Sequence, residues 1–176
     1  MRIRKQDGFT LIDMLFVCGL IGILSIIALP RLLLAKQAAG AASAIGSLRA
    51  VNSAQLTFAL TCGAGFYAPN LTTLGQPPAG SNEAFISPNL ATSDSVVRSG
   101  YTIQVLGTAY QGAPVSCNGL SAGESAQAFK AAADPTEVEN RRYFATNSNG
   151  QLYENNTSLW GAMPESGEPV AGHVLY

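Results

Sequence analysis

Gly8-Phe9-Thr10-Leu11-Ile12-Asp13 decides the fold, because this stretch joins a short basic leader to a long apolar segment. The apolar segment runs from Phe9 to Leu29 and its only charged residue is Asp13. These 21 residues make about 32 Å of helix, which is enough to cross the hydrocarbon core of a bilayer. A carboxylate at the centre of such a span costs about 2.5–3.5 kcal/mol, so even near its edge we expect Asp13 to bind a partner.

The charges before the apolar segment predict its orientation. Arg2, Arg4 and Lys5 outnumber Asp7 there. Because basic flanks stay on the cytoplasmic side, we expect residues 1–8 in the cytoplasm and the bulk of the chain across the membrane, in a single pass.

The position of the small residue separates this leader from a secretory signal. A secretory signal carries its small-residue cleavage site after the apolar core, whereas Gly8 lies before it. Here the chain resembles the type IV prepilins and the type II secretion pseudopilins, whose leader ends in Gly and whose mature chain begins Phe-Thr-Leu-Ile followed by an acid. The matching residues are Gly8, the run from Phe9 to Ile12, and Asp13. The resemblance covers about residues 8–35.

The resemblance implies two processing steps and one assembly contact. A prepilin peptidase would cut between Gly8 and Phe9 and methylate the new amino group of Phe9. Asp13 would pair with the charged amino terminus of a neighbouring subunit as that subunit leaves the lipid, since opposite charges attract strongly in a low-dielectric stack. Most family members carry Glu at this position, and Asp is one methylene shorter. The alternative is that Asp13 lies at the headgroup level and stays hydrated.

A long helix is expected to continue beyond the span to about Leu60. Pro30 lacks an amide hydrogen and therefore predicts a kink. The resemblance extends to Gly22 and Pro30, and it implies that Gly19, Gly22 and Pro30 allow this stretch to lose helical hydrogen bonds in the assembled filament.

The expected domains follow the composition. Residues 1–8 form the cleaved leader, residues 9–34 the membrane-spanning helix that would form the filament core, and residues 35–60 an amphipathic helix. The apolar stripe of that last segment recurs at spacings of three and four and needs a sheet to cover it. Its members are Ile45, Leu48, Val51, Ala54 and Phe58.

The remainder, residues 61–176, is large enough for one globular head. Turn-forming residues predict a loop region over 63–98, followed by a sheet over 99–155 and a tail over 156–176. Expected strands are 101–106, 127–131, 142–146 and 151–153, the last two joined through Asn149-Gly150, a strong hairpin signal.

The expected fold class is therefore α+β: a pilin fold in which one long N-terminal helix packs its second half on a four-stranded antiparallel sheet. Ser99-Gly100-Tyr101-Thr102 and the run from Arg142 to Thr146 are also similar, more loosely, to bacterial pilin-like proteins with this arrangement.

Two of the three cysteines are expected to form a disulfide. Cys18 lies in the span and is most simply a small apolar residue, which leaves Cys62 and Cys117 on the outer, oxidising side. A disulfide that closes a loop of about 55 residues would stabilise the fold by about 4 kcal/mol in the chain-entropy model. The alternative is two buried free thiols.

Residues with catalytic or metal-binding chemistry are sparse. The only histidine is His173, close to the C-terminus, and the sequence has no phosphate-binding glycine loop and no zinc motif. Asp134, Glu137 and Glu139 have the oxygen ligands that calcium prefers, but a solvated turn is the favoured interpretation. We therefore expect no enzyme activity, no cofactor and no metal.

The charge of the outer part disfavours a nucleic acid partner. Residues 61–176 contain four basic and nine acidic residues, and Arg141-Arg142 is their only adjacent basic pair. Nucleic acid binding normally needs clustered Lys or Arg, so none is expected. Arg141 and Arg142 could as easily complement the acidic loop just before them.

The resemblance implies a structural subunit of a type IV pilus-like filament, which is a helical homo-oligomer. The subunit would be stored in the bacterial inner membrane and would reach the cell surface in the pilus. Its partners would be the membrane, the prepilin peptidase, and the assembly platform with its ATPase. The alternative is a pseudopilin of a type II secretion system.

Overall fold

The structure is a computed structural model that describes residues 10–175. It divides into two compact units, Met1–Ala38 and Ala39–Tyr176. The first unit contains the start of helix α1, and the second unit, which we call the head, contains the remainder of α1 and every strand.

Helix α1 spans Leu11–Thr61 and contains Pro30. Its sequence is rich in leucine and alanine, which favour helix. The end is well defined: the amide of Gly63 donates to the carbonyl of Phe58, and the amide of Gly65 donates to that of Ala59. Gly65 takes a left-handed conformation with φ of 94°, as is common after a helix terminus. The expected end near Leu60 therefore agrees with the structure.

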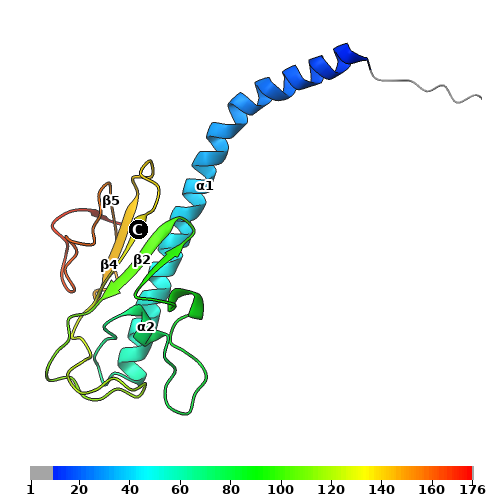
Figure 1. Ribbon diagram of the computed structural model, residues 1–176. Coiled ribbons are helices and arrows are strands. Elements are labelled where there is room, and N and C mark those ends of the chain that lie inside the picture. Colours follow the sequence, from blue (N-terminus) through cyan, green and yellow to red (C-terminus); the bar gives the residue numbers. More distant parts are fainter. Residues whose placement is uncertain (1–9, 176) are drawn as a thin grey trace, which may run out of the picture. The chain divides into compact units, whose positions relative to one another are not determined.

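The head is organised around the second half of α1, which lies alongside β2 in Figure 1. The apolar stripe expected from the sequence faces the core, with only Ile45 partly exposed. Gln55 is also fully buried on this face, and its amide exchanges two hydrogen bonds of 2.9 Å with the backbone of Ala68. These bonds fix the first loop after the helix against α1.

One antiparallel sheet of six strands, in the order β1-β2-β3-β4-β5-β6, packs on this helix. Every pair of neighbours is antiparallel and consecutive in sequence, so the sheet is a simple meander. The strands are β1 Ser95–Arg98, β2 Tyr101–Leu106, β3 Lys130–Pro135, β4 Tyr143–Asn147, β5 Leu152–Asn155 and β6 His173–Val174. Two short helices, α2 Leu71–Leu74 and the 3₁₀ helix η1 Pro88–Leu90, interrupt the loop before β1.

The four-stranded sheet expected from the sequence is thus wrong in number, because both edge strands were missed. Strand β1 lies inside the segment expected to be loop. It pairs with β2 through a two-residue turn, Ser99-Gly100, in which both residues have positive φ (50° and 80°). Strand β6 contains only two residues, which is too short for an alternation signal. It is defined by its pairing with β5.

The second expected strand, 127–131, was placed too early. Strand β3 begins at Lys130 and continues to Pro135. Ala126 instead makes isolated bridges to Tyr67 and Ala109, because the chain there pairs with loops and not with β2.

The two faces of the sheet have different covers. The inner face packs on α1 through alternating residues such as Tyr101, Ile103 and Val105. The outer face is covered by the segment after β5, where Leu159 and Met163 pack on Tyr153. The segment between β5 and β6, residues 156–172, which we call the outer cover, thus packs on the sheet through Leu159 and Met163.

The β1–β2 turn contacts α1 at a point where only glycine fits. A Cβ atom on Gly40 would lie 2.8 Å from the carbonyl oxygen of Ser99, which is closer than real Cβ contacts. One turn further along α1, the hydroxyls of Ser43 and Ser99 are hydrogen-bonded at 3.0 Å. The small residues of this helix segment thus allow the hairpin to approach the helix backbone.

Candidate assembly surface

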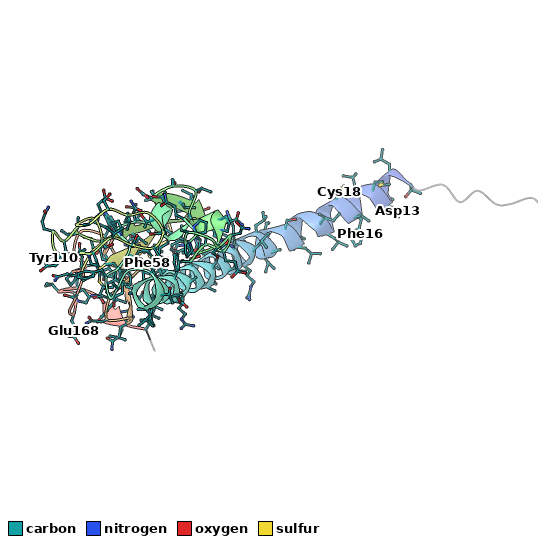
Figure 2. The ribbon with its side chains drawn as sticks, turned by 90° about the horizontal axis from the view of Figure 1, so that it is seen from below. Asp13, Phe16, Cys18, Phe58, Tyr110 and Glu168 are labelled. Atoms are coloured by element: carbon teal, nitrogen blue, oxygen red, sulfur yellow. A yellow bond between two sulfur atoms is a disulfide. The ribbon has the colours of Figure 1, made fainter. Side chains whose placement is uncertain are left out.

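The first part of α1 has a continuous apolar surface. Sixteen large apolar side chains between Leu11 and Leu34 are exposed, from Leu33 at 43% to Leu11 at 79%. This is the one helix among residues 10–175 that is long and apolar enough to cross a membrane, by length and composition. We call the residues from Leu11 to Leu34 the apolar rod. In Figure 2 the labelled Phe16 stands off the helix surface, where it is 68% exposed.

Asp13 lies at the start of the apolar rod and is bound locally. Its Oδ2 accepts hydrogen bonds from the backbone amide of Thr10 at 3.1 Å and from the Thr10 hydroxyl at 2.6 Å. In return, the amide of Asp13 donates to the Thr10 hydroxyl at 3.4 Å. Thr10 is the N-cap, so the two residues form a capping box in which Asp replaces the usual Glu or Gln. The Thr-x-x-acid spacing signals this contact, although it was not predicted from the sequence.

The remaining residues with expected assembly roles are distributed as follows. Gly8 and Phe9 lie outside the described residues. Gly19, Gly22 and Pro30 are all inside α1, and a Cβ atom added to either glycine would have no neighbour within 4 Å. Helix continues through all three residues in the single chain, so their loss of helical hydrogen bonds, which concerns the assembled filament, stays a prediction.

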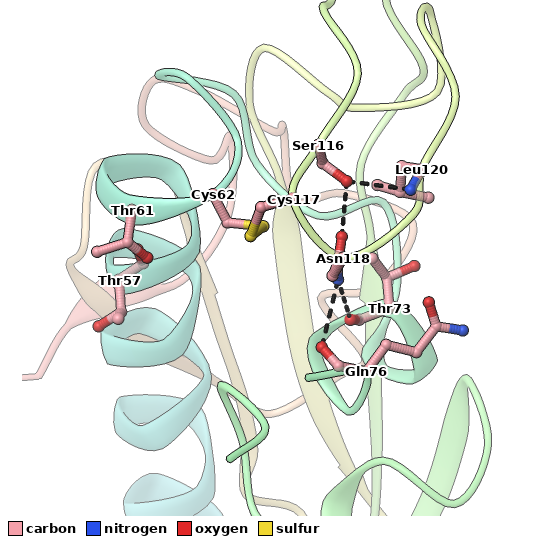
Figure 3. The surroundings of a disulfide bond; sticks show 9 residues. All are labelled: Thr57, Thr61, Cys62, Thr73, Gln76, Ser116, Cys117, Asn118 and Leu120. Atoms are coloured by element: carbon pink, nitrogen blue, oxygen red, sulfur yellow. Dashed lines mark hydrogen bonds between the residues drawn. A yellow bond between two sulfur atoms is a disulfide. The ribbon is translucent and has the colours of Figure 1, made fainter. Parts of the chain in front are cut away.

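Cys62 and Cys117 are joined by a disulfide (Figure 3). Their Cα atoms are 4.9 Å apart and 55 positions separate them in sequence. The backbone amide of Cys117 also donates to the carbonyl of Cys62. The disulfide therefore attaches the long loop between β2 and β3 to the end of α1. Cys18 is free and exposed in the apolar rod.

The loop that carries Cys117 is also held from its other side. The hydroxyl of Ser116 donates to the side chain of Asn118, whose amide donates to the carbonyl of Thr73 at 2.9 Å (Figure 3). These contacts connect the loop to α2, so the end of α1, α2 and the β2–β3 loop form one connected region.

The acidic residues considered for calcium do not come together. Asp134 lies on β3, where its Oδ2 accepts from the Ser158 hydroxyl at 2.5 Å, while Glu137 and Glu139 lie in the following loop. Burial raises the pKa of Asp134, against the opposing effect of the Ser158 hydrogen bond. Within residues 10–175, no group of three or more acidic, His or Cys side chains could hold a metal ion.

Arg142 has a partner that was not predicted from the sequence. Its guanidinium binds Glu154 on β5 in a bidentate manner, with Nε to Oε1 at 2.6 Å and Nη2 to Oε2 at 3.1 Å. The hydrogen bond from Arg142 holds the pKa of Glu154 below its usual value. Arg142 therefore complements the neighbouring strand, and not the acidic loop before it. The pair follows from the register of the β4–β5 hairpin, in which Phe144 lies opposite Glu154, and no local pattern in the sequence marked it.

His173, the only histidine of the sequence, is exposed in the structure. It lies in β6, opposite Glu154 on β5.

Comparisons of this chain with family models, with curated proteins and with solved structures found no match.

Proposed function

We propose that this chain is a structural subunit of a type IV pilus-like filament with a pilin fold. It is inserted in the inner membrane as a precursor, cleaved after Gly8, N-methylated on Phe9, and polymerised through its apolar rod. Its partners are the membrane, the prepilin peptidase, further copies of itself, and the assembly platform with its ATPase.

The observation that carries the proposal is the combination of the exposed apolar rod with a single acid at its start. Exposed apolar patches larger than a few hundred Å² are uncommon on soluble monomers and mark surfaces that bind lipid or protein. Lipid would surround the apolar side chains of the rod before assembly. Copies of the same rod would surround them afterwards, since close packing of helices replaces lipid contacts. A filament of this kind needs no active site and no cofactor.

The capping box at Asp13 refines the proposed subunit contact. The hydrogen bonds from Thr10 all reach Oδ2, so Oδ1 is the oxygen that remains for a second copy. Between packed apolar helices, a terminal ammonium that binds Oδ1 is attracted to the carboxylate far more strongly than in water. Burying either charge alone costs free energy, because the charge loses its hydration. Asp13 would thus serve its own helix with one oxygen and a neighbouring subunit with the other.

The proposal is tested first by the mature N-terminus and by the filaments themselves. Mass spectrometry of the chain from its native membrane should find Phe9 as the first residue with one added methyl group, and an intact Met1 would contradict the proposal. Surface shearing followed by electron microscopy should find long filaments that contain this chain. Their absence despite normal expression would favour a type II secretion pseudopilin.

Substitutions of Asp13 separate the subunit contact from helix capping. Asp13→Asn keeps an oxygen for the Thr10 amide but removes the charge, whereas Asp13→Glu keeps the charge. We expect Asp13→Asn and Asp13→Ala to lose most filaments, because removing one member of a buried ion pair costs about 3–5 kcal/mol. Asp13→Glu should retain them. Normal filament abundance with Asp13→Asn would show that the carboxylate only caps the helix.

A further inference from the structure

The head contains a cavity of about 560 Å³ that the filament function does not use. It lies between the start of the β2–β3 loop, which supplies Thr108 and Tyr110, and the outer cover, which supplies Glu165 and Ser166. Tyr67, Gln127 and Ser148 also line it. This volume falls in the range of about 300–1,000 Å³ that is usual for small-molecule sites.

The tyrosines of this cavity are held in place by packing. The ring of Tyr110 stacks on Phe66 with a centroid distance of 5.8 Å and an interplanar angle of 13°. The ring of Tyr67 packs on Phe129 at 5.1 Å. Tyr110 is nevertheless 42% exposed, and Figure 2 shows it at the periphery of the head. Rings that are fixed from behind and open in front can bind a flat apolar face at little entropic cost.

Among the polar groups of the cavity, the Glu165 carboxylate is a fixed acceptor, the Ser148 hydroxyl donates to the backbone carbonyl of Glu165 at 2.8 Å, and two side chains are not engaged. Glu165 is fixed by Thr108, whose amide donates to both carboxylate oxygens and whose hydroxyl donates to Oε1 at 2.6 Å. Within the described part of the chain, the side chains of Gln127 and Ser166 make no hydrogen bond. They therefore supply an amide and a hydroxyl beside a carboxylate that still has acceptor capacity at Oε2.

The charge of the lining determines which ligand chemistry fits. No Lys, Arg or His among residues 10–175 lines the cavity, and its one charged group is Glu165. An anionic ligand would be repelled by that carboxylate and would find no cation. A neutral ligand with several hydroxyl groups and an apolar CH face matches both the polar groups and the tyrosine rings.

We propose that this cavity binds a neutral carbohydrate residue, which lies with its CH face against the exposed ring of Tyr110 and donates a hydrogen bond from one of its hydroxyl groups to Glu165. This inference concerns the head alone and does not depend on the proposed filament function. A peptide is a less suitable occupant, because the cavity is formed by loops and the outer cover, whereas a peptide strand would add to β1 or β6 at the edges of the sheet.

The experiment uses the full chain in a sugar-free zwitterionic detergent and saturation-transfer difference NMR. The probes are lactose, cellobiose and N,N'-diacetylchitobiose. We expect at least one of them to bind with a Kd of about 1 mM or tighter, and its CH protons should receive saturation. Glucose 6-phosphate should bind more weakly than glucose. No transfer to any of the neutral sugars at about ten times that concentration would overturn the proposal.

Matched variants locate the binding. Gln127→Ala and Glu165→Gln should each weaken binding about tenfold, which corresponds to about 1.4 kcal/mol, whereas the exposed Gln76→Ala and Glu168→Gln should not. Tyr110→Ala should abolish the transfer and Tyr110→Phe should keep most of it, because only the ring face is needed. Unchanged binding in Gln127→Ala, Glu165→Gln and Tyr110→Ala would place the sugar elsewhere and overturn the assignment.

Discussion

The two halves of α1 share an apolar composition but differ in what covers them. In the head, Leu48, Val51 and Phe58 are fully buried beneath the sheet. In the apolar rod, side chains of the same kind, such as Leu15 and Phe16, are more than half exposed. The difference shows that apolar side chains alone do not specify their partner. The sheet covers the second half of the helix, whereas the side chains of the first half are exposed in the described structure.

The largest effect on the stability of the head is expected from substituting a phenylalanine in the covered half of α1, compared with one in the apolar rod. Phe58 is fully buried and packs edge-to-face on Phe85 at 5.3 Å, so Phe58→Ala should destabilise the head by about 3–5 kcal/mol. Phe16→Ala should leave the head's stability unchanged. Denaturant unfolding followed by tryptophan fluorescence measures both. Equal losses in the two variants would mean that the apolar rod contributes to the stability of the head.

A second contrast concerns the cysteines. Reducing the Cys62–Cys117 disulfide, or replacing both residues by Ser, should cost the head about 2–4 kcal/mol, because the unfolded chain regains the freedom of the closed loop. Cys18→Ser, in the apolar rod, is the matched control and should have no effect on the same unfolding curve. A head that unfolds at the same denaturant concentration with and without reductant would contradict this expectation.

Replacing a glycine by alanine in the covered half of α1 should change the stability of the head by a smaller amount, and the sign should differ between two positions. Gly40→Ala should destabilise the head by about 1–3 kcal/mol, since its Cβ would meet the Ser99 carbonyl. Gly46→Ala has open space around it and should stabilise the helix by about 0.5–1 kcal/mol. Thermal unfolding of the two variants tests the close approach of the β1–β2 turn, and a stabilising Gly40→Ala would show that the turn does not pack there.

The smallest expected effect is electrostatic and depends on pH. Because the Arg142 hydrogen bond lowers the folded-state pKa of Glu154 below its ordinary value of 4.5, the pair stabilises the head above that pH. This contribution is lost as the pH falls through the lower folded value. Solvent screening limits it to about 0.2–1 kcal/mol. Glu154→Gln should therefore be less stable than the parent at pH 7, and the difference should disappear below the folded-state pKa of Glu154, whereas the exposed Glu83→Gln should differ little from the parent over the same pH range.

Local sequence patterns were sufficient to predict those elements that neighbouring residues define on their own. The stripe from Leu48 to Phe58 predicted the covered face of α1, and the alternation from Tyr101 to Leu106 predicted β2 with its bounds. Asn149-Gly150 predicted the β4–β5 hairpin, although only Gly150 has positive φ. These features depend on periodicity and on turn chemistry, which neighbouring residues define.

Features made by distant residues were missed. The strand β6 exists because β5 offers an edge, and the cavity at Tyr110 exists because the outer cover returns to the β2–β3 loop. The pair of Arg142 and Glu154 likewise depends on strand register. None of these has a local pattern, since each needs two segments to be placed side by side first.

The sequence by itself determined the long apolar helix, its acid at the start and the α+β class, because hydrophobic length and periodicity are local properties of the chain. Only the tertiary structure decided the six-stranded sheet, the packed outer cover and the pairing of Arg142 with Glu154. These three features form between segments that are distant in sequence. Each provides hydrogen-bond partners or apolar contacts that a single segment lacks.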